Sequence, residues 1–251
     1  NNFISGGMLL GSDTVIVEGC VFANTTGVAI APRTDTSMLR HVVISDCTFD
    51  NIRGDSCIHF WNLLMFETLS VTGCQFENVR WGVRVRNIGS SSTSGYNMDF
   101  TSVVIANNTF TNCTGLAIYV NSTSEYTIQN VSVTGNSIYS AGASGISVDG
   151  CNVVKISDNL IHNSGGRDST ADTSAISVSG ANTNIVAITN NTIHDFGRRG
   201  ILINTATAAT VSGNQISGSA AYTGNAYAIA VHTITSGFIS DNVVSATTGV
   251  D

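Results

Sequence analysis

The sequence has few charged residues, a single lysine and no long apolar run, and these shortages exclude whole classes of protein. Asp and Glu (17) outnumber Lys and Arg (10), which gives a formal net charge of −7. A nucleic-acid-binding protein normally carries a basic stripe, so we expect no nucleic-acid partner. A membrane-spanning helix needs a run of about 18 or more apolar residues. Because the chain has no such run, we expect no membrane insertion.

The scarcity of charge does not indicate disorder. Charged residues make up 11% of the chain and apolar residues 42%, and the apolar residues recur at regular intervals. Disordered segments have the opposite balance, with low hydrophobicity and high net charge. We therefore expect one continuous core and a single domain that covers residues 1–251.

Six cysteines are present, but their spacing fits no metal site. Cys20, Cys47 and Cys74 occupy equivalent positions in consecutive repeats, which favours a stack of free thiols over disulfides. Free thiols are typical of proteins that assemble in a reducing cytoplasm. We expect neither a metal nor a cofactor.

One short motif returns ten times along the chain: an aliphatic residue, two spacers, an Asn or Cys, one spacer and a bulky apolar residue. The first copy is only the tail of the motif, and the other nine are complete. The Asn or Cys stands at positions 2, 20, 47, 74, 108, 136, 159, 191, 214 and 242, most often 23 to 28 residues apart. Such a period is typical of a solenoid or a propeller, and a propeller blade needs about 40 residues. A solenoid is therefore favoured.

Each repeat contains two strand patterns. Apolar residues occupy every second position before the Asn or Cys, as at Val42 and Ile44, which predicts a strand with one buried face. A second short strand follows the Asn or Cys, as in Cys57–Phe60 and Gly82–Val85. One repeat thus supplies one coil of a parallel β-helix. We expect the repeated Asn to adopt left-handed backbone at the turn and to bond through its amide to the next coil.

The repeat, with Ser/Thr–Asn/Gly–Asn before the apolar residue and Gly-Ile-x-Val after it, resembles the right-handed parallel β-helix of pectate lyases and phage tailspikes over essentially the whole chain. The resemblance implies an all-β, right-handed, single-stranded parallel β-helix of about nine to ten coils. It also implies a substrate cleft along the second strand and its preceding loop. The Trp-x-Asp-His signature of pectate lyases and the Gly-His-Gly motif of polygalacturonases are absent. Because the chain begins and stops inside a coil, we expect a piece truncated at both ends from a longer polypeptide.

Outward positions of the second strands form columns, because equal repeat positions become neighbours on adjacent coils. Most of these residues are small, but on three consecutive coils they form a cluster of aromatic and cationic side chains: His59, Trp61, Arg84, Arg86 and Tyr119. Aromatic faces stack on sugar rings, and guanidinium groups bind carboxylates in bidentate fashion. We predict that these five residues bind a glycan, especially an acidic one. The alternative is an ordinary exposed face.

Two carboxylates, Asp50 and Glu77, stand three positions after the Cys of consecutive repeats. A carboxyl pair about 5 to 9 Å apart can cleave a glycosidic bond, one acting as acid and the other as base or nucleophile. We predict this catalytic role for the pair, with Asp55 as a substitute; carboxylates at a solvated turn are the alternative. An eliminase would instead use His59 or Arg84 as base, with Arg86 holding the uronate. His162, His194 and Asp195 form another cluster, in which two imidazoles and a carboxylate could hold a metal. Two surface histidines at equivalent positions are the alternative, and we favour it.

These features together favour the body of a phage tailspike or tail fibre. Outward apolar residues on the first strands (Ile16, Val43, Val104 and Phe238) predict packing into a homotrimer. We expect the protein to bind, and to depolymerise, a bacterial surface polysaccharide, by hydrolysis rather than elimination, and to be located in the virion or to be secreted. A non-enzymatic glycan-binding module, a secreted polysaccharide lyase or epimerase, and a structural spacer or adhesin shaft are the alternatives.

Overall fold

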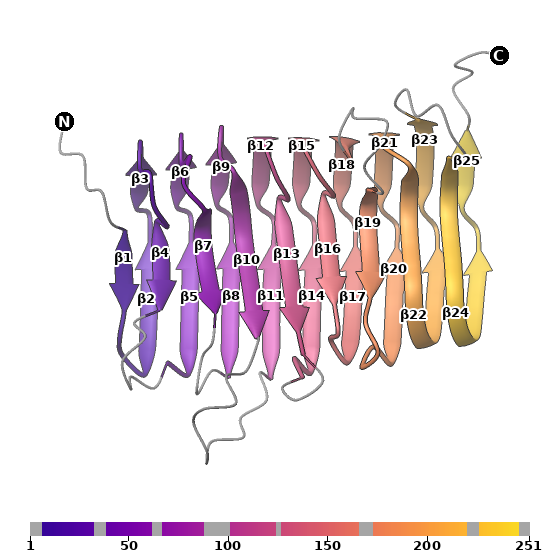
Figure 1. Ribbon diagram of the computed structural model, residues 1–251, viewed down its shortest axis with the longest axis horizontal. Coiled ribbons are helices and arrows are strands. Elements are labelled where there is room, and N and C mark those ends of the chain that lie inside the picture. Colours follow the sequence, from indigo (N-terminus) through magenta and orange to yellow (C-terminus); the bar gives the residue numbers. More distant parts are fainter. Residues whose placement is uncertain are drawn as a thin grey trace.

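The computed structural model describes residues 7–32, 39–61, 67–87, 101–123, 127–165, 173–219 and 226–245. These residues form strands and turns stacked into a right-handed parallel β-helix, whose coils run from left to right in Figure 1. Within this part of the chain there is no helix that could cross a membrane. The predicted fold class is confirmed.

Three walls enclose the core of the solenoid (Figure 1). The front wall consists of β1 (Met8–Leu10), β4 (Ile30–Pro32), β7 (Ser56–Trp61), β10 (Trp81–Asn87), β13 (Ile118–Ser122), β16 (Ile146–Asp149) and β19 (Ser174–Ser179). The rear wall consists of β2 (Thr14–Glu18), β5 (His41–Ser45), β8 (Thr68–Thr72), β11 (Ser102–Ala106), β14 (Asn130–Thr134), β17 (Val153–Ser157) and β20 (Ile185–Thr189). The upper wall consists of β3 (Val21–Ala23), β6 (Thr48–Asp50), β9 (Gln75–Glu77), β12 (Thr109–Cys113), β15 (Ser137–Ala141), β18 (Leu160–Ser164), β21 (Thr192–Phe196), β23 (Gln215–Ser219) and β25 (Val243–Ser245).

Two long strands, β22 (Arg199–Ser212) and β24 (Tyr227–Ser240), continue from the front wall into the rear wall. They join the two walls into one sheet, while the upper wall is a separate sheet. Every strand pairing among the described residues is parallel, and each coil follows its neighbour in register. Equal repeat positions therefore lie side by side, as the repeat predicts.

The core is built from columns of identical side-chain type. Phe22, Phe49, Phe76 and Phe110 stack along the upper wall, with ring centroids 4.5 to 5.1 Å apart and ring planes within 6° of parallel. The column continues with buried isoleucines, of which Ile138 is the first. Burial of every second residue explains the period-two pattern of the sequence.

The turns differ from the sequence prediction in one respect. The repeated Asn or Cys was expected to adopt left-handed backbone, and this is wrong. The residue immediately before it does so instead, as Gly73 (φ 65°) does before Cys74 and Asn107 (φ 56°) does before Asn108. A second left-handed residue lies four positions after the Asn or Cys, as at Asn78 and Asn112. Gly, Asn and Asp dominate these sites because they tolerate positive φ at low cost.

The repeated Asn residues instead form a buried ladder between coils. The Asn159 amide accepts hydrogen bonds from the backbone and side-chain nitrogens of Asn136 and donates one to the Val133 carbonyl. Asn191 repeats the pattern one coil later. The predicted amide bonding is confirmed. It satisfies polar groups that the bend would otherwise leave buried without partners.

Cysteine thiols replace the amides in the first coils. The Cys47 thiol lies 3.6 Å from the Val17 carbonyl and the Cys74 thiol lies 3.7 Å from the Ile44 carbonyl, in the place that the Asn amide occupies elsewhere. All six cysteines are free. The predicted stack of free thiols is confirmed.

Candidate functional site

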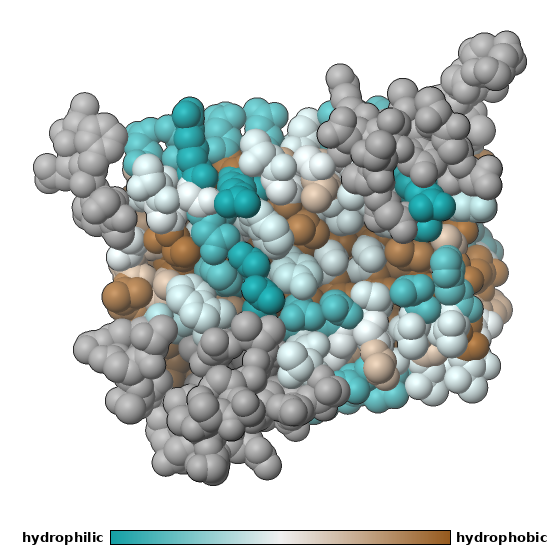
Figure 2. Space-filling view, in the orientation of Figure 1, coloured by the Kyte–Doolittle hydropathy of each residue, from teal (hydrophilic) through white to brown (hydrophobic). Residues whose placement is uncertain are grey.

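The aromatic and cationic residues predicted from the sequence lie together on the front wall. Arg84 of β10 pairs with His59 of β7 on one side and with Tyr119 of β13 on the other. Two residues further along, Arg86 pairs with Trp61. Figure 2 shows this wall from outside, where hydrophilic residues form a band across β7 and β10. The in-register strands thus gather the five side chains from three coils.

Asp55 holds the centre of this group. Its carboxylate accepts a hydrogen bond of 2.9 Å from the Arg84 guanidinium through one oxygen, and its other oxygen lies 3.0 Å from Nδ1 of His59. Asp55 belongs to the short loop between β6 and β7, so the loop places its charge directly above the two strands. One carboxylate therefore binds the guanidinium and contacts the imidazole.

Trp81 completes the cluster, although the sequence did not single it out. The Arg84 guanidinium carbon lies over the Trp81 ring, 4.4 Å from its centre, and Tyr119 meets the ring edge to face with centroids 5.8 Å apart. Strict alternation from Val83 would place Trp81 on the buried side, so the sequence pattern does not predict its place in this cluster. Gly115 permits its position, because a Cβ there would come within 2.7 Å of the indole nitrogen. In the sequence, the sign of this arrangement is a glycine on the coil next to the tryptophan, which leaves room for the indole ring.

His59 faces away from the core but is covered, with only 7% of its surface exposed. Its ring lies 4.4 Å from the Trp61 ring, centroid to centroid. Burial lowers the pKa of His59 to about 4; the Asp55 carboxylate opposes this shift and the Arg84 charge adds to it. His59 is therefore neutral at physiological pH. Because so little of His59 is exposed, we expect it to position Asp55 and Trp61 and not to contact a ligand itself.

Tyr119 is half-buried beside charges of both signs. Burial, followed by the negative charge of Asp149, raises its pKa, while Arg86 and Arg84 oppose the shift. Its hydroxyl thus stays protonated and remains a hydrogen-bond donor and acceptor. Trp61, Trp81, Arg84 and Arg86 are likewise half-buried, so this part of the front wall offers aromatic faces and cations to a ligand.

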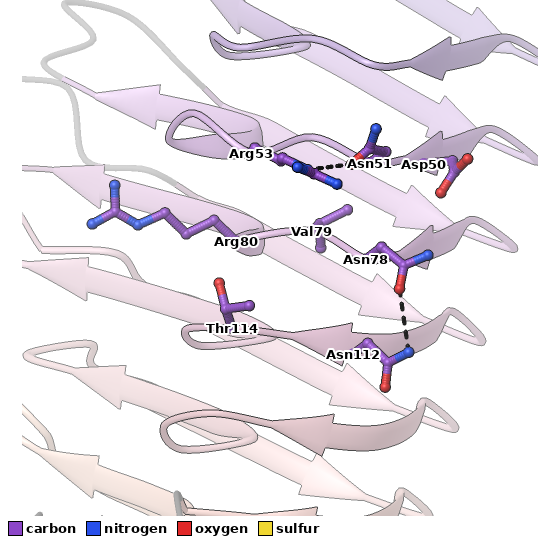
Figure 3. A pocket seen from close by; sticks show the side chains of 8 residues that line it. All are labelled: Asp50, Asn51, Arg53, Asn78, Val79, Arg80, Asn112 and Thr114. Carbon is purple, nitrogen blue, oxygen red and sulfur yellow. Dashed lines mark hydrogen bonds between the residues drawn. The ribbon is translucent and has the colours of Figure 1, made fainter.

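A hollow of about 720 Å³ lies at the corner between the upper and front walls. Its lining, drawn in Figure 3, consists of Asp50, Asn51, Arg53, Asn78, Val79, Arg80, Asn112 and Thr114. Arg53 donates a hydrogen bond to the Asn51 amide oxygen, and Asn112 donates one to Asn78. The Arg80 side chain extends away from Asp50, as Figure 3 shows, and donates to the carbonyl of Gly54, next to Asp55. The hollow therefore borders the loop that carries Asp55.

The predicted carboxylate pair lies at this corner. Asp50 of β6 and Glu77 of β9 are direct partners in the parallel pairing, so their backbones are one strand spacing of about 4.8 Å apart. Asp50 is half-buried and lines the hollow, whereas Glu77 is exposed. The structure thus places the two residues side by side on adjacent strands, with Asp50 lining the hollow.

The histidine cluster is also assembled in register. His162 and His194 are direct strand partners with ring centroids 6.4 Å apart, and His162 Nε2 lies 3.3 Å from the Asp195 carboxylate. His194 Nδ1 bonds to the Ser217 hydroxyl. Nowhere in the described ranges do three or more His, Cys, Asp or Glu side chains come together in a way that could hold a metal ion. The cluster therefore gives no reason to assign a metal site.

Comparison with known families agrees with this architecture. The model of the family described as "Right handed beta helix region" matches residues 87–250, which is more than half of the chain. The chain belongs to this family. No curated protein matches it. A right-handed β-helix family defines a scaffold and not a reaction, so the function must be argued from the side chains.

One solved structure that resembles the chain is titled "Glycoside hydrolase". It has a TM-score of 0.42 and 16% sequence identity, and the match covers 79% of this chain. This chain spans 38% of the length of that protein.

Proposed function

We propose that the front wall over β7, β10 and β13 binds an acidic polysaccharide from a bacterial surface. The observation that carries the proposal is the contact of the Arg84 guanidinium with both the Trp81 ring and the Asp55 carboxylate. A fixed guanidinium next to aromatic faces suits a sugar ring that bears a carboxylate. Arg86 and Tyr119 extend the same surface.

Direct binding measurements test this proposal. Calorimetry with purified capsular and lipopolysaccharide preparations should detect binding that Arg84→Ala and Arg86→Ala each weaken at least about tenfold, the scale of a lost charge-assisted hydrogen bond. Lys155→Ala, on the rear wall, removes one positive charge from another wall and serves as the control. Wild-type protein that binds none of the preparations would refute the proposal.

We propose in addition that Asp50 and Glu77 hydrolyse the bound polymer. Their pairing on adjacent strands supports this, because side chains that leave neighbouring strands about 4.8 Å apart can bring their carboxyls to the separation of about 5 to 5.5 Å that retaining glycosidases use. In this proposal Asp50, which lines the hollow, attacks the anomeric carbon as the nucleophile, and Glu77 is the general acid that gives a proton to the departing glycosidic oxygen. Water, deprotonated by Glu77, then releases the sugar from Asp50 and restores both groups.

The products of a digestion distinguish hydrolysis from the alternatives. New reducing ends without ultraviolet-absorbing unsaturated sugars would support hydrolysis, and Glu77→Gln should abolish their formation while binding is retained. Unsaturated products would favour elimination, although Arg84 is paired with Asp55 and His59 is covered. Binding without any shortening of the polymer would favour the non-enzymatic glycan-binding module.

We further propose that three copies associate through the rear wall in a phage tailspike, or in a secreted counterpart. Ile16 and Phe238 support this, being 66% and 62% exposed on the outward side of that wall, while Val43 and Val104 are half-buried in the same column. Polar residues fill other positions of the column: Ser70, Ser132, Lys155 and Thr210. Light scattering that gives a monomer mass at high concentration would refute the proposed association.

A further inference from the structure

The front wall carries a second polar group, beyond the aromatic and cationic cluster. The column that begins with Trp61 and Arg86 continues with Asn121, Asp149 and Ser179 on the next three coils. The Asn121 amide donates a hydrogen bond of 3.0 Å to one oxygen of Asp149, and the Ser179 hydroxyl donates one of 3.1 Å to the other. The carboxylate is thus held from the coil before it and the coil after it.

Asp149 is closely packed on the side of the next coil. Gly180 lies so close that a Cβ there would come within 2.6 Å of Asp149 Oδ1. Within the part of the chain that the structure describes, no cation forms an ion pair with this carboxylate. The side chain is half-buried, and each oxygen keeps further acceptor capacity beyond its one hydrogen bond. A carboxylate that is held by two neutral donors and keeps acceptor capacity on both oxygens can accept hydrogen bonds from a ligand.

The order of charges along the wall restricts the ligand. Arg86 and Asp149 are two strand spacings apart, or roughly 10 Å, with Tyr119 on the neighbouring column between them. A polymer lying along the helix axis therefore passes first over two guanidinium groups and then over a carboxylate. A uniformly acidic polymer would place one of its own carboxylates against Asp149, and like charges at short range repel.

We propose that Asn121, Asp149 and Ser179 form a subsite for a neutral sugar, next to the acidic-sugar subsite at Arg84 and Arg86. This rests on the proposed function of the same wall and narrows its substrate class. The ligand is then a mixed polysaccharide in which acidic and neutral sugars follow one another. Hydroxyl groups of the neutral sugar donate to the Asp149 oxygens, and the amide of Asn121 bonds beside them.

A panel of polymers and one isosteric variant test the subsite. The panel contains polygalacturonate as a uniform polyanion, hyaluronan and acidic bacterial heteropolysaccharides as mixed polymers, and dextran as a neutral one. Wild-type protein should bind at least one mixed polymer more tightly than polygalacturonate. Asp149→Asn should weaken that binding about tenfold and leave or strengthen binding of polygalacturonate, because it removes a repulsive charge.

Two further variants separate the subsite from unspecific effects. Glu18→Gln removes an exposed carboxylate on the rear wall and should change neither affinity. Ser179→Ala loosens Asp149 without altering charge and should weaken the mixed polymer alone, which keeps the test valid if Asp149→Asn unfolds the protein. The subsite proposal would be overturned if the wild type bound uniform and mixed polymers equally well. It would also be overturned if Asp149→Asn and Ser179→Ala both kept the wild-type preference. Neither result would contradict the proposed function. Absence of binding to every polymer would overturn both.

Discussion

The guanidinium carbon of Arg84 lies 4.4 Å from the centre of the Trp81 ring, and the same guanidinium donates a hydrogen bond to the Asp55 carboxylate. The ring and the carboxylate together fix the plane of the guanidinium. An arginine held in this way loses little conformational entropy when it binds a second carboxylate, and a planar fork matches a carboxylate better than an ammonium does. The Arg84 side chain is thus preorganised for ligand binding.

Replacement of Arg84 by Lys should weaken binding of an acidic polysaccharide about tenfold, although the charge is kept. Lysine lacks the planar fork and stacks less well on the indole. Calorimetry would measure the affinity. The matched control is Arg40→Lys, because the Arg40 guanidinium pairs with Asp13 beside the rear wall, away from the proposed site. An Arg84→Lys protein with wild-type affinity would show that charge alone matters.

Acid should destabilise the fold through His59. Its pKa is lowered to about 4 in the folded protein from an ordinary value of 6.5, mainly by burial. The stabilisation is complete above pH 6.5 and is lost as the pH falls through 6.5 toward 4, because the unfolded chain binds the proton more readily. Denaturant titrations should measure the free energy of unfolding of wild type and His59→Gln at several pH values in this window. As the pH falls, the wild type should lose on the order of 2–3 kcal/mol more than the variant. Parallel curves would contradict the assignment.

Removal of one Asn from the buried ladder should be costly. Asn159→Ala deprives the Asn136 backbone nitrogen and the Val133 carbonyl of their partners. A buried polar group without a partner costs about 1–3 kcal/mol, so the free energy of unfolding should fall by about 2–4 kcal/mol. Asn130→Ala removes an exposed side chain with one backbone bond and should cost less than about 0.5 kcal/mol. Equal losses would show that the ladder adds no stability.

Native cysteines should differ strongly in their reaction with iodoacetamide. Burial raises the pKa of Cys113 and of Cys151 to about 12, and the thiolate is the reactive species. Cys20 is the least buried of the six. Mass spectrometry at pH 8 to 9 should find Cys20 modified first and Cys113 and Cys151 only after unfolding. Rapid modification of Cys151 in folded protein would contradict its burial.

Much of the architecture could be predicted because the same motif recurs ten times in the sequence. A period-two apolar pattern together with a constant spacing leaves a parallel solenoid as the structure that buries every apolar position. The pairing of Arg84 with His59, and of Asp50 with Glu77, followed from that spacing alone. The error at the turns arose because Asn tolerates left-handed backbone, as do the Gly, Asp or Asn that precede the ladder position, and positive φ was assigned to the repeated residue and not to the residue before it.

The candidate site was only partly predictable. Asp55 lies in a loop, where alternation does not apply, and Trp81 stands at the start of a strand, where alternation assigns it to the buried side although it is half-buried. Asp149 lies inside a column, but its importance comes from hydrogen bonds to coils on both sides. Such contacts depend on how side chains turn after the coils have stacked.

The sequence by itself therefore determined the coil, its period and the residues that share a column, because short-range alternation and repeat length are properties of the linear chain. Only the tertiary structure decided that His59 is covered, that Arg84 lies between an indole and a carboxylate, and that Asp149 is held from two sides. These arrangements depend on burial and on contacts between coils more than twenty residues apart in the sequence, which exist only after the chain has wound on itself.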